Sequence, residues 1–176
     1  MNKILKILLL VLIFDFSGIA QNNQLNQANM LFSAQRYSAA QSLYQSMISN
    51  NIADEAVYYY HAKCAKELFA SDAVHLYQKF LLDFPFTSFR DKVNEDLAFL
   101  YLRQKDYTRA IPFLEGLEEL DVQPYLMFNL AYAYFITDSL IEAQYYFSKI
   151  INIDSKYAPA AQYYSAYIAY RNGFYQ

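Results

Sequence analysis

Small and large apolar residues recur in a fixed order along most of the chain. Alanine occupies two places in a unit of about 34 residues. The first place holds Ala28, Ala62, Ala98, Ala131 and Ala166, and the second holds Ala40, Ala73, Ala110 and Ala143. A large residue follows the second place by four positions, at Tyr44, Tyr77, Leu114 and Phe147. This pattern predicts paired helices that cross closely at small residues and stack, each unit burying its apolar face against its neighbours.

Capping residues and prolines mark where these helices start and stop. Ser139 and Glu142 have the spacing of a capping box at a helix N-terminus. Pro85, Pro124 and Pro159 fall between units, where a helix must be interrupted. We expect nine helices, at residues 22–35, 38–49, 54–67, 71–83, 88–104, 107–120, 124–137, 140–152 and 157–171.

The repeat resembles the tetratricopeptide repeat (TPR) over residues 21–176. The fourth unit matches best, with Met127, Leu130, Ala131, Tyr134, Ala143 and Phe147 at the family's spacing. The resemblance implies an all-α fold, a right-handed α-solenoid of paired antiparallel helices with about four and a half repeats. The repeats would span about 21–54, 55–90, 91–123, 124–158 and, as a partial unit, 159–176. We expect either that this is the N-terminal piece of a longer repeat protein, or that its last helix pairs with another chain and forms a homo-oligomer.

The first twenty residues have a different character. Lys3 and Lys6 precede an apolar run over residues 7–14, and small residues lead up to Ala20. This order predicts a signal peptide cleaved after Ala20. The run is shorter than the ~20 apolar residues of a membrane span, so we expect a periplasmic or secreted protein with no membrane span in the mature chain. The Asn/Gln-rich start that follows is similar to exported proteins of Bacteroidetes-type bacteria. The alternative is that residues 1–20 form a buried first helix.

The charge of the chain narrows the class of partner. Without residues 1–20 the chain has 14 − 2 = 12 basic and 17 − 1 = 16 acidic side chains, a net charge near −4. A nucleic-acid-binding domain normally carries a basic surface, so we expect no nucleic acid partner. Hydrophobic residues make up 56% of the whole chain, with 19 Tyr and 14 Phe among them. That content is sufficient for one helical domain with a continuous core.

No residue pattern indicates an enzyme, a metal or a cofactor. Three glycines in the whole chain are too few for a glycine-rich phosphate-binding loop. His61 and Cys64 lie one helical turn apart and could offer two metal ligands, but no second pair has ligand spacing. We expect Cys64, the only cysteine, to be a small buried hydrophobe, with a reactive thiol or an intermolecular disulfide as the alternative.

One acidic cluster could supply a catalytic site. Its members are Glu115, Glu118, Glu119 and Asp121. Paired carboxylates can hydrolyse glycosides, yet these lie at the spacing of a solvated helix face. We therefore expect the protein not to be an enzyme.

The family resemblance implies where a partner would bind. In TPR proteins the first helix of each pair lines a concave groove. Carried over by repeat phase, the groove positions are Tyr59 and Lys63 in the second unit, Phe99, Leu102 and Arg103 in the third, Tyr125, Phe128, Tyr132 and Phe135 in the fourth, and Tyr163, Tyr167, Tyr170 and Arg171 in the fifth. Aromatic residues and arginine dominate binding energy at protein interfaces. The alternative is that some of these rings pack against the second helices and never meet a partner.

These patterns favour a noncatalytic, exported scaffold. We expect it to bind a peptide segment or a protein partner in an aromatic concave groove, as related repeat proteins do in cell-envelope assembly. One alternative is a sensory or regulatory ectodomain of a larger signalling protein. Another is the capture of a glycan on the aromatic groove, for which tryptophan would be expected and is absent.

Overall fold

The computed structural model describes residues 22–117 and 123–173. Within these ranges all regular secondary structure is helical, in nine helices, so the predicted all-α class is confirmed. The chain divides into two compact units, Met1–Thr87 and Ser88–Gln176. The predicted signal peptide over residues 1–20 lies outside the described residues, as do three members of the acidic cluster, Glu118, Glu119 and Asp121.

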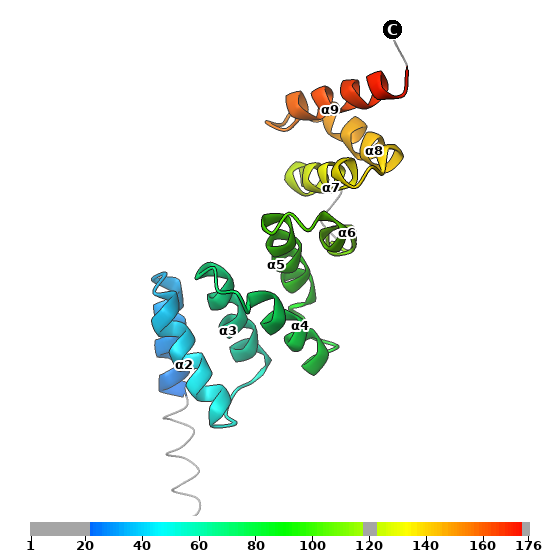
Figure 1. Ribbon diagram of the computed structural model, residues 1–176. Coiled ribbons are helices and arrows are strands. Elements are labelled where there is room, and N and C mark those ends of the chain that lie inside the picture. The colour runs from blue at the N-terminus through cyan, green and yellow to red at the C-terminus, as the bar shows by residue number, and fades with distance from the viewer. Residues whose placement is uncertain (1–21, 118–122, 174–176) are drawn as a thin grey trace, which may run out of the picture. The chain divides into compact units, whose positions relative to one another are not determined.

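The first unit contains two helix pairs (Figure 1). Its helices are residues 22–33, α2 (Tyr37–Ser49), α3 (Glu55–Glu67) and α4 (Ala73–Asp83). Contacts run from α2 to α3 and from α3 to α4. The first pair is also joined by a hydrogen bond of 2.7 Å, which the buried Tyr44 hydroxyl donates to Asn29 Oδ1. The pairing predicted from the alanine positions is therefore present in this unit.

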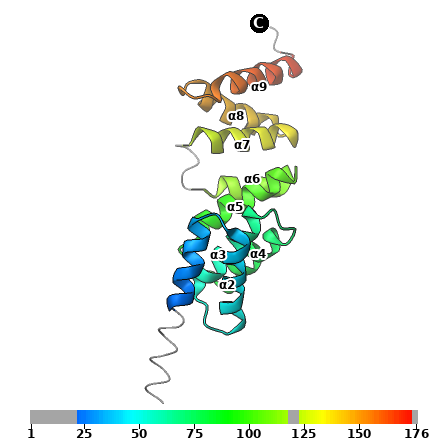
Figure 2. The same ribbon diagram turned by 90° about the vertical axis from the view of Figure 1, so that its left-hand side faces the viewer.

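The second unit contains five helices, each in contact with the next (Figure 2). They are α5 (Arg90–Arg103), α6 (Tyr107–Glu115), α7 (Pro124–Ile136), α8 (Leu140–Ile151) and α9 (Ala158–Arg171). Pro124 opens α7 at its first turn, where its missing N–H would have had no partner in the helix. α6 ends at Glu115, so the expectation of a helix to residue 120 was too long.

The alanines lie at the helix crossings, as their spacing predicted. In the second unit Ala98, Ala110, Ala131 and Ala143 are all 0% exposed. The large residues that follow the second place, Tyr44, Tyr77, Leu114 and Phe147, are also 0% exposed. Ala166 differs: it has the repeat phase of Ala131 but lies exposed on α9. Burial at these positions is thus set by a neighbouring helix as well as by the repeat.

The first helix of each of the first four pairs ends in the same backbone turn. A residue with positive φ follows it: Gln35 (57°), Phe69 (57°), Lys105 (59°) and Asp138 (64°). After the helix over 22–33, Gln35 N donates to Phe32 O at 2.9 Å and Arg36 N to Leu31 O at 2.9 Å. This pair of bonds is the Schellman motif, which usually has glycine at the positive-φ position. These four turns recur at about the spacing of the alanines, and the same turn also follows α2, at Asn51 (55°).

The helix N-termini are capped less often than the sequence suggests. The Asp54 carboxylate accepts from Val57 N at 3.0 Å, and that of Asp106 accepts from Arg109 N at 3.1 Å. Ser139 makes no side-chain cap bond, so the predicted capping box with Glu142 is wrong. The turn before α8 is closed instead by a backbone bond that Ser139 N donates to Tyr134 O at 2.9 Å. Within the described ranges no helix has both the length and the hydropathy to cross a bilayer.

Candidate functional site

Three rings lie on one face of α7. Phe128, Tyr132 and Phe135 are spaced by four and three positions, which places them above one another on a helix. The Phe128 and Tyr132 rings are stacked at 6.4 Å between centroids, and those of Tyr132 and Phe135 at 6.5 Å. All three side chains are partly exposed. The repeat phase had assigned all three to the binding surface.

Tyr164 of α9 contacts every ring of this row. Its centroid lies 6.3 Å from Phe128, 5.5 Å from Tyr132 and 5.1 Å from Phe135. Burial, followed by the nearby Tyr132 and Tyr163, raises the pKa of the Tyr164 hydroxyl above its ordinary value of 10.0. This hydroxyl is therefore protonated at neutral pH and can donate a hydrogen bond.

Tyr164 was not among the expected site residues. The groove places carried over from the family selected Tyr163, Tyr167 and Tyr170 on this helix. The sequence offered one signal for Tyr164: it lies seven residues after Tyr157, a spacing that returns to the same helix face. In the structure both rings contact Phe128. Tyr167 does reach α7, at 5.7 Å from Phe135.

The row continues toward α5 through Tyr125. Its ring stacks on Phe99 at 6.1 Å with 14° between the planes. Its hydroxyl donates a 2.8 Å hydrogen bond to Glu95 Oε1, which fixes the ring orientation. We call these seven rings of the second unit the aromatic surface: Phe99, Tyr125, Phe128, Tyr132, Phe135, Tyr164 and Tyr167.

Tyr59 does not lie on an open surface, so that expectation was wrong. It is 2% exposed, and its ring packs 6.4 Å from Tyr77 and 6.2 Å from Phe80 on α4. Its hydroxyl accepts from Lys63 Nζ at 3.1 Å. The second helix of the pair covers this ring, which is the alternative that the sequence left open.

Three further expected residues lie at the edges of the aromatic surface. Arg103 is exposed in the last turn of α5. Tyr163 is 65% and Tyr170 is 63% exposed on α9. The Tyr163 ring contacts Tyr164 of its own helix at 5.3 Å. These three side chains are accessible, but a role for them in binding stays a prediction.

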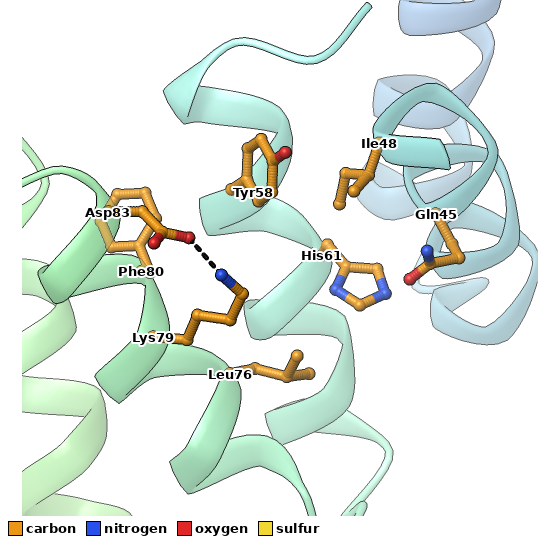
Figure 3. A pocket seen from close by; sticks show the side chains of 8 residues that line it. All are labelled: Gln45, Ile48, Tyr58, His61, Leu76, Lys79, Phe80 and Asp83. Carbon is orange, nitrogen blue, oxygen red and sulfur yellow. Dashed lines mark hydrogen bonds and ion pairs between the residues drawn. The ribbon is translucent and has the colours of Figure 1, made fainter. Parts of the chain in front are cut away.

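The first unit contains a separate cavity of about 200 Å³ between α2, α3 and α4 (Figure 3). Its lining residues are Gln45, Ile48, Tyr58, His61, Leu76, Lys79, Phe80 and Asp83. Lys79 Nζ and Asp83 Oδ2 lie 2.6 Å apart and compensate each other's charge. A cavity of ~150 Å³ can already hold a benzene ring, so this one could take a small neutral group. No sequence signal pointed to it, because its residues come from three helices.

His61 and Cys64 of α3 have no third metal ligand beside them among the described residues. Within residues 22–117 and 123–173, no three His, Cys, Asp or Glu side chains are grouped to hold a metal ion. Cys64 is 0% exposed in the core of the first unit, and burial raises the pKa of its thiol to about 12. The expectation of a small buried hydrophobe is confirmed. Burial also lowers the pKa of His61, against a smaller opposing effect of Asp72, so its imidazole is neutral.

Comparison with known proteins identifies the fold. No protein-family model and no curated protein matches the chain. A structure of MamA AMB-1 matches 89% of this chain and 85% of its own, with TM-score 0.74 and 21% identity. MamA MSR-1 matches with TM-score 0.67 and 21% identity, over 89% of this chain and 88% of its own.

YrrB, described as a TPR protein with an unusual peptide-binding site, is also similar. The match covers 92% of this chain and 84% of YrrB, with TM-score 0.71 and 18% identity. Identities this low show the fold alone. They confirm an all-α solenoid of the TPR type, as the sequence predicted.

Proposed function

We propose that this protein is a noncatalytic scaffold that binds a peptide segment or a protein partner on the aromatic surface. The observation that carries the proposal is the set of partly exposed rings shared by α5, α7 and α9. Tyrosine and phenylalanine bury large areas on binding and lose little rotamer freedom. Their mutual contacts hold them in place before a partner arrives, which lowers the entropic cost of association.

The fold supports the same class of function. Stacked helix pairs present an extended surface built from successive first helices. YrrB, which has this fold, is described as having a peptide-binding site. The described residues of the present chain contain no grouped metal ligands. A binding role therefore fits both the surface and the fold.

Affinity capture with matched baits tests this proposal. The full chain, Tyr132→Ala and Tyr145→Ala would each be used to capture proteins from cells of the organism of origin. Tyr145 of α8 is 54% exposed and lies outside the aromatic surface, so its variant is the control. We expect a protein that wild type and Tyr145→Ala retain equally and that Tyr132→Ala retains about tenfold less, as at an aromatic hot spot. Equal retention by all three baits would overturn the proposal.

We further propose that the scaffold is exported and acts in the cell envelope. This rests on the charged start, the apolar run and the small residues that precede Gln21. Mass analysis of the N-terminus of the protein from its own cells should find Gln21 as the first residue. An intact Met1 would refute cleavage and leave the binding proposal standing.

A further inference from the structure

The buried imidazole of His61 faces the cavity of the first unit. His61 is 9% exposed, and it lines both this cavity of about 200 Å³ and an adjoining hollow of about 400 Å³. Within the part of the chain that the structure describes, its ring has no hydrogen-bond partner. Buried polar groups are normally hydrogen-bonded, and leaving one without a partner costs free energy. A molecule that enters the cavity can therefore gain by bonding to this ring.

The walls of the cavity suit a single ring. Ile48 of α2 and Leu76 of α4 are half-buried, and Phe80 of α4 is 2% exposed (Figure 3). An apolar cavity of ~150 Å³ binds benzene. The present cavity of about 200 Å³ thus has room for one ring and a small polar substituent.

The hydrogen-bonding groups favour a hydroxyl as that substituent. Burial lowers the pKa of His61, so its imidazole is neutral at neutral pH and has one N–H donor and one acceptor nitrogen. A hydroxyl both donates and accepts, so it can bond with either nitrogen, whereas an ether or a carbonyl can only accept. Gln45 Nε2 donates to Ser49 Oγ at 3.2 Å, which leaves the amide oxygen as a second acceptor. The Gln45 and His61 side chains point toward one another (Figure 3).

The charges at the mouth of the cavity disfavour an ionised ligand. Lys79 and Asp83 are exposed there, and their charged atoms lie 2.6 Å apart. The adjoining hollow adds only uncharged side chains, those of Gln41 and Ser42. An ionised ligand would leave water without meeting an uncompensated opposite charge, which costs free energy.

We propose that this cavity binds an uncharged phenol, a single aromatic ring that carries a hydroxyl group. The ring would lie between Ile48, Leu76 and Phe80, and its hydroxyl would bond with His61. The cavity lies within the first unit and shares no residue with the aromatic surface. The inference therefore goes beyond the proposed function and stands or fails without it.

Titration of the full chain with phenol, followed by the NMR signals of the Ile48 and Leu76 methyl groups, tests the inference. We expect saturable shifts of these signals. His61→Leu should weaken phenol binding about fivefold or more, because it removes one hydrogen bond, and should not weaken the binding of toluene, which has a methyl group in place of the hydroxyl. His61→Gln keeps a donor and an acceptor and should retain phenol. His75 is exposed on α4 and does not line the cavity, so His75→Leu is the matched control.

Two further variants locate the bound ring. Leu76→Trp fills the cavity from a half-buried wall, so it should abolish phenol binding and gives an answer even if His61→Leu folds poorly. Tyr132→Ala should bind phenol as wild type does, because Tyr132 lies in the second unit. The inference is overturned if phenol produces no saturable shift or benzoate binds more tightly than phenol. It is also overturned if Leu76→Trp or both His61 variants bind phenol as wild type does.

A last titration distinguishes two sources of the phenol group. N-acetyltyrosinamide carries the same ring on a capped amino acid. If it binds as tightly as phenol, and its binding is lost in Leu76→Trp, the natural ligand is a tyrosine side chain of a peptide. If phenol binds and N-acetyltyrosinamide does not, the natural ligand is a free small molecule. Binding of neither compound overturns the inference.

Discussion

The ring of Tyr164 on α9 lies edge to face against Tyr132 on α7, with 5.5 Å between centroids and 64° between the planes. This contact joins the first helices of two successive repeats. Edge-to-face aromatic pairs contribute ~0.5–1.5 kcal/mol beyond the area that they bury. The same rings remain partly exposed. The aromatic surface therefore contributes to the stacking of repeats and stays available to a partner.

Because Tyr164 helps to hold helices together, truncating it should lower stability more than truncating an exposed tyrosine outside the aromatic surface. Tyr164 contacts rings on α7 and also Phe147 of α8, at 5.4 Å. Tyr164→Ala should lower the free energy of unfolding by about 2 kcal/mol or more, because it removes packing against two helices. Tyr145→Ala should cost no more than about 0.5 kcal/mol. Urea denaturation of both variants gives the comparison, and an equal cost for the two would contradict the packing described for α9.

The loss of stability caused by enlarging an alanine should depend on whether a neighbouring helix covers it. Ala131 is 0% exposed, whereas Ala166 holds the same repeat phase and is exposed. Ala131→Leu should cost ~1–3 kcal/mol of stability, because added methyl groups have no room in a close-packed crossing. Ala166→Leu should stay within about 0.5 kcal/mol of wild type. Thermal or urea unfolding would measure both, and equal losses would show that the repeat phase alone sets the cost.

Glycine should stabilise the turn after the first described helix. Gln35 has φ of 57° and is exposed, and side chains with a Cβ pay a steric cost in this left-handed region. Gln35→Gly should raise the free energy of unfolding by about 0.5–1 kcal/mol, the steric gain exceeding the added flexibility of the unfolded chain. Gln35→Ala keeps the Cβ and is the control, expected near wild type. A loss of stability in the glycine variant would argue against the Schellman turn there.

Burial of His61 should make stability depend on pH. Its pKa lies below the ordinary 6.5 in the folded protein, because burial disfavours the charged imidazole. As pH falls through 6.5 the unfolded chain takes up the proton first, so stability is complete above this pH and is lost below it, until the folded pKa is reached.

Two histidine variants isolate this effect. Urea denaturation at about pH 7.5 and about pH 5.5 should show a smaller loss for His61→Gln than for wild type. His75 is exposed, so His75→Gln should keep the wild-type dependence. If His61→Gln loses as much stability as wild type over this range, His61 is not the responsible group.

The fold was largely predictable from the sequence because helix crossing depends on local spacing. Alanine at matched places in successive units fixes which helix faces can approach, and Ala98, Ala131 and Ala143 are buried accordingly. The turns were less predictable. Gln35, Phe69 and Lys105 adopt positive φ without the glycine that usually marks it, since the Schellman bonds hold the backbone there.

The candidate site was predictable in part, because repeat phase gives a helix face but not what covers it. Phase placed Phe128, Tyr132 and Phe135 on one accessible face, as the structure has them. It placed Tyr59 there too, although Tyr77 and Phe80 of α4 cover that ring. The cavity beside His61 had no signal, because its lining comes together only when three helices pack.

The most direct test of the scaffold proposal is photo-crosslinking in the cells of the organism of origin. A photoreactive phenylalanine would replace Tyr132, Tyr167 or, as the control, Tyr145, one position at a time in the full chain. The account predicts crosslinked adducts to the same partner from positions 132 and 167, and none from position 145. An adduct that forms only at position 145, or no adduct at positions 132 and 167, would contradict the claim that the aromatic surface binds a partner.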